Sequence, residues 1–557
     1  MSFKLQAHKD DFLFIPIGGS NEIGINVNVY HYKGKLLIVD CGSGFADDFL
    51  PGVDMLVADM SFIEKNKDKV VGLVLTHAHE DHLGAVQYLW NDIQCPIYAT
   101  TFTANFLKLR LAEYSFGKKI KITEIKPGGK IDLEPFNIEM VPLTHSAPEM
   151  QALMIRTSAG NVMHTGDWKF DPDPLVGPAS DLALLKKCGD EGVLALVCDS
   201  TNVFNPGTSG SEGELRKSLV KIIQSCKKMV VATTFASNLA RLDTLIHAAA
   251  ESKRKVVLSG RSMHRMYAAA QASGYLVGIA SVVDERDISR YKREELMVIA
   301  TGCQGEPMAT AAKLAAKTHH SIKLAPEDTV IFSSKIIPGN EKKIYRMFNQ
   351  FVRSGIEVIT EDDHFVHVSG HPAVEELKKM YELVRPQIAI PVHGEPVHIH
   401  EHAKLARSWG APHAVEVENG SVVLLNSDNP RIVDTVENGY LGVEGNYLLP
   451  IDSPIFKARR RMRDDGVAVV TVVLGREGKM AAKPVVSIPG CLDPQEDIDL
   501  LVSIRDEIEE SVSFAIGSKQ VKKDVNIEDV VRNALRRILR EEVGKNPMII
   551  VNVEKTH

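Results

Sequence analysis

GLVLTHAHEDHLGA, residues 72–85, joins a short apolar run to a group of side chains that can bind metals. Residues 72–76 have the length and composition of a buried strand, and the small residues at the end of the stretch are typical of a helix start. Three histidines and an aspartate fall within residues 77–82. On a helix His77 and His82 would point apart, whereas a tight loop between a strand and a helix lets them converge. Imidazole and carboxylate together suit zinc, manganese or iron, so the stretch predicts a metal site. The alternative is a polar surface turn, which is disfavoured because burying so many titratable groups without a metal is costly.

Other apolar runs in the first 200 residues also end in a side chain that could take part in chemistry. They include LLIVD at residues 36–40, VPLTH at residues 141–145 and VLALVCD at residues 193–199. Such runs predict buried strands, and loops at their carboxyl ends can present polar side chains above a rigid sheet. QIAIPVH at residues 387–393 has the same style, so an inserted domain is expected before it.

The HxHxDH pattern that follows a strand resembles the metallo-β-lactamase fold. This resemblance implies two metal positions, and it implies that Asp40 supports the metal loop without binding an ion. The implied ligands are His77, His79 and His145 for one ion, Asp81, His82 and His393 for the other, and Asp167, in HTGD at residues 164–167, for both. Two ions about 3.5 to 4 Å apart can clamp the attacking and leaving oxygens of a phosphoryl displacement. Because such a pair also serves lactone and thioester hydrolysis, the metal centre alone does not select the substrate.

The chain from residue 206 to residue 370 has the pattern of a separate α/β domain. It follows a turn-rich break, NPGTSGS at residues 205–211, and Ser211 with Glu214 predicts a capping box at a helix start. Strands then alternate with helices, which is typical of a parallel sheet.

EGNYLLPIDSPIF, residues 444–456, has the prolines and glycine of a linker, and a small α+β domain is predicted after it. The apolar residues from Val530 to Leu539 recur at core-type helical spacing, and the simplest interpretation is the core of this small domain. Its predicted elements are strands at 467–474 and 548–553 and helices at about 496–515 and 527–542.

HFVHVSGHP, residues 364–372, resembles the HxSGH segment of the β-CASP nucleases, most closely that of the ribonuclease J family. GGSNEIG at residues 18–24, TFASN at 234–238 and GRSM at 260–263 agree with that family, so the resemblance covers about residues 12–440 and, in layout, the C-terminal domain. It implies an α/β fold, namely a metallo-β-lactamase αββα sandwich with an inserted β-CASP α/β domain and a small C-terminal α+β domain. The implied boundaries are 1–205 and 371–443 for the metallo-β-lactamase domain, 206–370 for the β-CASP domain, 444–456 for the linker and 457–557 for the C-terminal domain.

The HxSGH segment also has a physical case as a phosphate site. Gly370 lets the backbone approach a phosphate closely, Ser369 can donate its hydroxyl, and His371 can act as a general acid near the leaving oxygen. Asp199 matches an acidic β-CASP motif and is expected to orient its neighbours without binding a metal. Taken alone, the segment is equally well explained as a buried turn, and Ser237 with Asn238 as a helix cap. The residues predicted to contact RNA are His367, Val368, Ser369, Gly370, His371, Ser237 and Asn238, and those predicted to take part in catalysis are Asp81, His371 and Asp199.

Composition limits the possible partners. A net charge of −7 gives the protein no overall electrostatic attraction for RNA. RNA must therefore be bound by local positive charge, either the metal ions or basic clusters such as the five cations in residues 457–463. The seven cysteines form no CxxC pair, no apolar run reaches about 18 residues and the N-terminus lacks a signal, so a cytoplasmic protein without a membrane span is expected. Five histidines that fit no motif are predicted to face solvent: His319, His320, His398, His400 and His402.

The ribonuclease J resemblance implies a metal-dependent hydrolase of RNA phosphodiesters that serves RNA maturation and decay. It implies endonuclease activity and 5′-to-3′ exonuclease activity on single-stranded RNA with a 5′-monophosphate. It also implies two divalent ions per chain, zinc first with manganese or magnesium as alternatives, and a homodimer or homotetramer. Two other functions remain open. A small-molecule hydrolase of lactones or thioesters would not need the insertion, and a non-catalytic RNA scaffold would not need the complete ligand set.

Overall fold

The structure is a computed structural model that describes residues 8–47, 49–279, 282–476, 478–517 and 526–556. The chain forms two compact units. The first consists of Met1–Gly44 and Val57–Tyr440, and the second of Phe45–Leu56 and Leu441–His557. Within the described ranges, no helix combines the length and the apolar composition that crossing a bilayer requires.

Two sheets face each other in the first unit. In the first sheet β1, β2 and β3 are antiparallel neighbours, and β3, β6, β7 and β8 are parallel. Its spatial order is β23 (Arg431–Thr435), β22 (Ser421–Leu424), β1 (Leu13–Gly18), β2 (Val27–Tyr32), β3 (Lys35–Val39), β6 (Val70–Val74), β7 (Ile97–Ala99) and β8 (Ile122–Glu124). In the second sheet β12, β13 and β20 are parallel. Its order is β21 (His413–Ala414), β20 (Ile388–Val392), β13 (Ala195–Asp199), β12 (Gly160–His164), β11 (Gln151–Thr157), β10 (Phe136–Pro142) and β9 (Lys130–Leu133).

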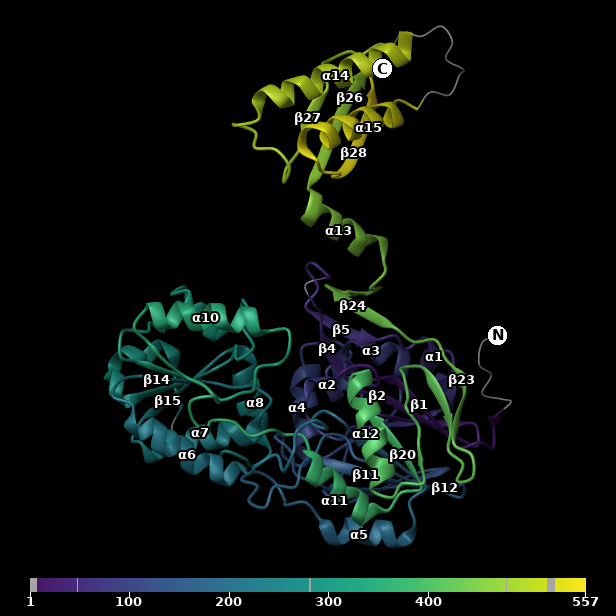
Figure 1. Ribbon diagram of the computed structural model, residues 1–557, viewed down its shortest axis with the longest axis vertical. Coiled ribbons are helices and arrows are strands. Elements are labelled where there is room, and N and C mark those ends of the chain that lie inside the picture. Colours follow the sequence, from purple (N-terminus) through teal and green to yellow (C-terminus); the bar gives the residue numbers. More distant parts are fainter. Residues whose placement is uncertain (1–7, 48, 280–281, 477, 518–525, 557) are drawn as a thin grey trace. The chain divides into compact units, whose positions relative to one another are not determined.

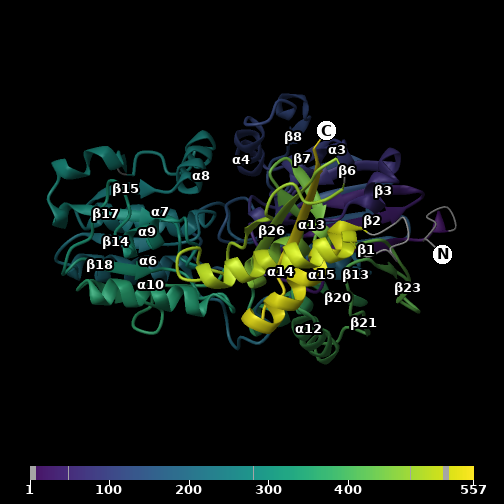
Figure 2. The same cartoon turned by 90° about the horizontal axis from the view of Figure 1, so that it is seen from above.

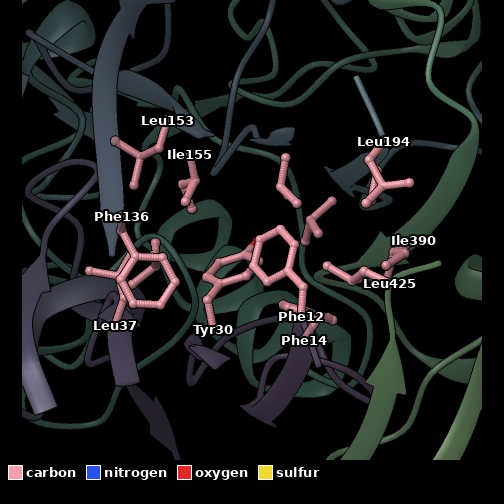
Figure 3. Packing of buried hydrophobic residues seen from close by; sticks show 14 of the residues in the cluster. Phe12, Phe14, Tyr30, Leu37, Phe136, Leu153, Ile155, Leu194, Ile390 and Leu425 are labelled. Atoms are coloured by element: carbon pink, nitrogen blue, oxygen red, sulfur yellow. The ribbon is translucent and has the colours of Figure 1, made fainter. Parts of the chain in front are cut away.

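Apolar side chains from the two sheets meet in one core (Figure 3). Alternate residues of a strand point to the same face, so Phe12, Phe14 and Tyr30 of the first sheet all point toward the second. Phe136, Leu153 and Ile155 meet them from the second sheet. This shared core fixes the two sheets against each other and therefore fixes the strand ends that carry the candidate ligands.

Helices cover the outer faces of both sheets. On the first sheet α4 (Thr101–Leu111) contacts β7 and β8, and α1 (Ser61–Glu64) packs against α3 (Val86–Ile93). On the second sheet, side chains of α5 (Leu182–Glu191), α11 (Val374–Val384) and α12 (Pro396–Ser408) share a second core with strand residues such as Ala152 and Leu196. The order is helix, sheet, sheet, helix, which confirms the predicted αββα sandwich.

The inserted segment forms a parallel sheet of six strands with helices on both faces. In spatial order the strands are β16 (Val282–Val283), β15 (Lys255–Ser259), β17 (Leu296–Ala300), β14 (Val230–Thr233), β18 (Thr329–Phe332) and β19 (Glu357–Ile359). Figure 2 shows β15, β17, β14 and β18 side by side in that order. α10 (Glu341–Arg353) lies on one face, and α6 (Glu212–Ser225) and α7 (Leu239–Glu251) lie on the other (Figure 1). α8 (Arg261–Ala272) and α9 (Thr310–Ala315) complete the insertion, and Met347 and Phe351 of α10 pack onto alternate strand residues. The predicted parallel α/β domain is confirmed.

The second unit contains a sheet of three strands, in which β26 (Val467–Leu474) pairs antiparallel with β27 (Val485–Ser487) and parallel with β28 (Met548–Lys555). Residues of β26 alternate between buried and half-buried, which is the pattern of a sheet covered on one face. α14 (Ile498–Gly517) and α15 (Ile527–Ile538) pack on the covered face through residues such as Ile508, Val531 and Leu535. The spacing of apolar residues in the second predicted helix therefore does belong to the core of this domain.

The segment predicted as a linker, residues 444–456, contains regular secondary structure. β24 (Tyr440–Glu444) and β25 (Tyr447–Pro450) form a hairpin there, and α13 (Pro454–Asp465) begins soon after it. Phe456 is fully buried against Leu50 and Val53, from the short excursion between β4 (Ser43–Phe45) and β5 (Met55–Ala58). The prolines misled the prediction because one ends a strand and the other opens a helix, two places where proline is tolerated.

Most of the basic cluster at residues 457–463 is used inside the second unit. Arg459 pairs with both carboxylate oxygens of Glu444, at 2.6 and 2.8 Å. The guanidinium of Arg460 lies 4.1 Å from the ring centre of Phe49, and Arg461 donates to the carbonyl of Asn546 at 3.0 Å. The cluster is therefore a weaker candidate for RNA contact than its charge indicates.

Three local predictions in the first unit are corrected. The helix start expected at the end of residues 72–85 is interrupted, because α2 (Glu80–Leu83) ends before Gly84 and α3 begins only at Val86. Ser211 caps α6 by accepting from Gly213 N, not from Glu214 as a capping box requires. His402 and His319 are buried although they were predicted to face solvent, and His402 lies at 2.8 Å from Ser200 Oγ and 3.1 Å from Tyr381 OH.

Candidate metal centre

The loop that follows β6 is braced by Asp40, at the end of the neighbouring parallel strand β3. Asp40 is fully buried, and its carboxylate accepts hydrogen bonds from Thr76 N and Thr76 Oγ1, both at 2.8 Å, and from His82 Nδ1 at 2.7 Å. Donation from Nδ1 leaves the Nε2 lone pair of His82 free for a ligand. The φ of Asp40 is +64°, a left-handed conformation that is strained for a residue other than glycine and that marks many functional sites.

The first candidate metal position is formed by His77, His79, His145 and Asp167, whose ligand atoms all lie within 4.8 Å of one another. His79 Nδ1 and His145 Nε2 are 3.0 Å apart, and His77 Nε2 lies 4.0 Å from Asp167 Oδ2. The other nitrogen of His145 is 2.6 Å from the carbonyl of Gly370, in the HxSGH segment. The structure thus brings together four residues from three separate parts of the sequence.

The second candidate position is formed by Asp81, His82, His393 and, again, Asp167. Asp167 Oδ2 lies 3.1 Å from His82 Nε2 and 3.6 Å from His393 Nε2. Asp81 Oδ2 lies 3.6 Å from His82 Nε2 and 3.8 Å from His393 Nε2. Asp167 therefore belongs to both groups of candidate ligands.

Unpaired buried atoms at both positions fit metal ions. His77 Nε2, His393 Nε2 and Asp167 Oδ1 are buried and have no hydrogen-bond partner among the residues that the structure describes. Leaving such atoms unpaired costs about 1 to 3 kcal/mol each unless something binds them. A set of imidazoles and carboxylates without thiolate is the donor set of a catalytic rather than a structural metal site.

The electrostatics of the site agree with metal binding. Burial lowers the pKa of His77 and of His145 well below the usual range, and it lowers the pKa of His79 to about 4. These rings are therefore neutral at pH 7, the form that binds metals. Burial also lowers the pKa of His82, but the nearby carboxylates, Asp167 first, outweigh it and raise the pKa. The raised pKa favours the protonated ring when no ion is bound, and a cation at this position would replace the proton on His82.

His371 and Asp199 form a pair beside the second position. His371 Nδ1 lies 2.8 Å from Asp199 Oδ2, and the other oxygen of Asp199 accepts from Thr201 N and Oγ1. Burial lowers the pKa of His371, but the charge of Asp199 and its hydrogen bond outweigh this and raise the pKa to about 9. The side chain of His371 is 24% exposed.

The other residues of the HxSGH segment differ in exposure. Val368 is buried, and His367 is half-buried with Nδ1 3.5 Å from Arg241 Nη1. Ser369 Oγ accepts from Asn202 Nδ2 at 2.7 Å and from His371 N at 3.2 Å. A Cβ on Gly370 would lie only 2.8 Å from the His145 ring, so only glycine fits at this position.

Ser237 and Asn238 lie at the start of α7. Asn238 caps the helix, because its side-chain oxygen accepts from Arg241 N at 2.8 Å. Ala240 N, in the first turn, donates to the carbonyl of Ser146 at 3.1 Å, so the start of α7 lies beside the candidate ligand His145. The structure thus gives Asn238 the capping role and also brings Ser237 and Asn238 near the metal centre.

Sequence analysis did not identify Asn26, Thr76 or Asn202. Asn26 lies between the histidines of the second position, with its amide nitrogen 3.0 Å from His82 Nε2 and its oxygen 3.0 Å from His393 Nδ1. Asn202 Nδ2 also donates to the carbonyl of His371 at 3.0 Å. The one sequence signal for Asn26 was an asparagine directly before an apolar run. Such a signal does not indicate which residues will contact its side chain.

Comparisons with protein-family models divide the chain in the same way as the fold. The matches are a beta-lactamase superfamily domain at residues 37–189, a Ribonuclease J beta-CASP domain at 227–351, a Zn-dependent metallo-hydrolase RNA specificity domain at 355–417 and a Ribonuclease J C-terminal domain at 455–555.

Curated relatives match over nearly the whole length. Ribonuclease J of Sinorhizobium meliloti is 37% identical over 564 residues, covering 99% of this chain and 100% of the relative. Ribonuclease J of Thermus thermophilus is 33% identical (97% and 95% covered), and Ribonuclease J2 of Bacillus subtilis is 31% identical (96% and 97% covered). A solved structure of a protein of unknown function from Enterococcus faecalis matches with a TM-score of 0.52 at 17% identity. It covers 74% of this chain and 100% of its own, and it supports the fold alone.

Proposed function

This chain belongs to the ribonuclease J family, and we propose that it is a two-metal ribonuclease that cuts RNA internally and also degrades it from a 5′-monophosphate end toward the 3′ end. Membership makes it a metal-dependent hydrolase of RNA phosphodiesters. The observation that carries the proposal is the pair of ligand groups that share Asp167, with the His371–Asp199 pair beside them.

His77, His79 and His145 would hold one ion, Asp81, His82 and His393 the other, and Asp167 both. Zinc is the expected ion, with manganese or magnesium as alternatives, because imidazole nitrogen supplies three of the four donors in the first group and two of the four in the second. Two bound divalent ions would supply charge neutralisation for the phosphate and lower the pKa of water.

The remaining steps depend on the chain's own side chains. His371 carries a proton that it can pass to the leaving 3′-oxygen, and Asp199 orients the ring through Nδ1. Asp40 and Thr76 hold the loop of the metal-binding residues, which keeps both positions in place when substrate binds. Asp81 would contribute to catalysis as a ligand of the ion at the second position.

The start of α7 supports the proposed 5′-end preference. Helix N-termini favour anions, and Ser237 and Asn238 lie there, next to the loop of His145. With His367, Val368, Ser369 and Gly370, they would bind the 5′-phosphate and the first phosphodiester. A phosphate held there would place the first linkage of the RNA at the metal centre, so nucleotides would be removed from the 5′ end.

The function is tested with three versions of one RNA sequence: a linear RNA with a 5′-monophosphate, the same RNA with a 5′-triphosphate, and a circular RNA. We expect mononucleotides from the first, slower exonucleolytic release from the second, and cutting of the circle, which only an endonuclease can attack. Resistance of the circle would remove the internal-cutting claim, and equal rates on both linear RNAs would remove the 5′-end preference.

The double variant Asp81→Ala, His82→Ala tests the metal assignment. It removes two ligands of the second position, so RNA cleavage should fall by at least about a thousandfold and bound metal should fall below two ions per chain. His320→Ala is the matched control, because that side chain is 80% exposed and lies outside the centre. Full cleavage by the double variant would show that the second position is not catalytic.

The cellular location and the oligomeric state of the protein are also part of the proposal. We place it in the cytoplasm as a homodimer or homotetramer that serves RNA maturation and decay. The family likeness and the scattered, unpaired cysteines support this assignment.

A further inference from the structure

A fully buried arginine lies behind the HxSGH segment. Arg241 is in the first turn of α7, its side chain is 0% exposed, and it therefore cannot touch RNA. Burying a guanidinium is costly unless its N–H groups are paired, so its contacts indicate what it does.

One side of the guanidinium is neutralised by Glu212, the first residue of α6. Arg241 Nη2 donates to Glu212 Oε1 at 3.0 Å and Nε donates to Oε2 at 3.3 Å, which is a two-pronged pair. Glu212 is itself 2% exposed, and its backbone N–H donates to Asp171 Oδ2 at 2.9 Å. Asp171 lies four positions after the shared ligand Asp167 in the sequence.

The other side of the guanidinium holds the backbone that leads into the HxSGH motif. Nη1 donates to Ser333 O and Ser333 Oγ, both at 2.8 Å, and Ser333 Oγ donates to the carbonyl of Val366 at 2.7 Å. Nη2 donates to the carbonyl of Val368 at 3.3 Å. Arg241 thus ties α6, the end of β18 and residues 366–368 to one point.

The next residues of the same segment meet the metal centre. The carbonyl of Gly370 is 2.6 Å from His145 Nδ1, and His371 Nδ1 is 2.8 Å from Asp199 Oδ2. Only two to three residues separate Gly370 and His371 from Val368. A shift of Val368 should therefore also displace these two residues.

We propose that Arg241 is a positioning residue for RNA cleavage, which holds residues 366–368 so that Gly370 meets His145 and His371 meets the leaving oxygen. The inference rests on the proposed role of His371. A lysine at this position keeps the charge but not the fork of donors, so it cannot pair with Glu212, Ser333 and Val368 together.

The matched control is Arg254, a second buried arginine of the same domain. It donates to the carbonyls of Lys228, Leu296 and Cys226 and has no contact with the HxSGH segment among the described residues. Arg241→Lys and Arg254→Lys each remove a buried guanidinium, so similar losses of folding stability are expected. The two variants differ in the backbone that loses its donor: Arg241 donates to Val368 beside the HxSGH motif, and Arg254 donates to carbonyls outside it.

The test is steady-state cleavage of a 5′-monophosphorylated RNA by the metal-loaded full chain. For Arg241→Lys we expect kcat to fall at least about tenfold, with KM and bound metal within about twofold of the unchanged protein. For Arg254→Lys we expect kcat within about twofold. Equal losses of kcat in the two variants, or an unchanged kcat in Arg241→Lys, would overturn the proposal.

A second measurement separates positioning of His371 from general loosening. In a His371→Ala background, Arg241→Lys should lower kcat by less than about twofold, because the group that it positions is already gone. Losses that multiply would overturn the proposal. If Arg241→Lys does not fold, Ser333→Ala removes the hydroxyl between the guanidinium and Val366; a severalfold loss of kcat supports the role, and no loss overturns it.

The two levels of inference fail separately. Absence of RNA cleavage by the unchanged protein would remove the proposed function. Cleavage by the unchanged protein together with an unaffected Arg241→Lys variant would remove only the role of Arg241.

Discussion

Asn26→Leu should weaken one metal position and spare the other. The Asn26 side chain is 3% exposed, and its amide contacts two histidines of the second position, His82 and His393. It contacts none of the three histidines of the first position among the described residues. Leucine has the same number and branching of side-chain heavy atoms, so the change removes the hydrogen bonds and keeps the outline of the side chain.

The magnitude follows from the contact with His393. If His393 binds an ion through Nε2, its Nδ1–H donates to Asn26 Oδ1 at 3.0 Å, and leucine leaves that N–H without a partner in a buried site. Loss of a partner that orients a metal-binding histidine lowers metal affinity about 10- to 100-fold. The loop itself should stay, because Asn26 N donates to Asp81 O and Asn26 O accepts from Gly42 N through the backbone alone.

The assay is competition for zinc between the metal-free protein and a chromophoric chelator, which gives a dissociation constant for each position. One constant should rise about 10- to 100-fold and the other should change less than about threefold. Asn28→Leu is the control, because Asn28 is also buried and its side-chain oxygen has no partner in the described part of the chain. Two unchanged constants, or two that rise equally, would refute the reasoning.

Three further predictions concern stability and assembly. Metal removal should lower the free energy of unfolding, measured from urea midpoints, by about 2.7 kcal/mol for each ion that had been present at 100 times its Kd, and zinc should restore it. A free energy of unfolding that does not change with metal would contradict metal binding by the buried ligand atoms. Burial lowers the pKa of His402 in the folded state to about 4, whereas the unfolded state binds a proton at this histidine below about pH 6.5. The folded state therefore loses stability relative to the unfolded state as the pH falls below about 6.5. In metal-free protein, His402→Gln should therefore reduce the loss between pH 7.5 and pH 5.0 by about 2 kcal/mol, measured from urea midpoints, and an unchanged loss would refute this. A chain that ends at Asp465 keeps Phe456 over Leu50 and Val53 but lacks residues 466–557, and light scattering should find it monomeric if those residues join the chains. An unchanged number of chains per particle would contradict that role.

Several candidate ligands and the supporting Asp40 were predictable because they follow apolar strands. Asp40, His77 and His393 come directly or almost directly after β3, β6 and β20, whose residues are nearly all buried. Strand order and register then fix where those ends meet, so an ordered set of strand-end side chains indicates one site. The alternating strands and helices of the insertion were predictable for the same reason.

Errors arose where burial comes from tertiary contacts instead of local pattern. Phe456 is buried by Leu50 and Val53, about four hundred positions earlier in the sequence, so the prolines around it indicated a linker. His402 lies on a helix rich in polar residues, and only its contacts with Ser200 and Tyr381 make it a core residue.

The same distinction separates ligands from the residues that position them. A ligand must be a histidine or a carboxylate, so its residue type limits the search, whereas an asparagine or an arginine has many uses and its type indicates none of them. The fold makes Asn26 a partner of His393, 367 positions away, and Arg241 a partner of the Val368 carbonyl, 127 positions away. Both contacts act on a group that is already in the site, so their loss should change affinity or kcat while leaving the ligand set complete. A variant series that separates ligands from positioning residues therefore tests the part of the site that a motif cannot reveal.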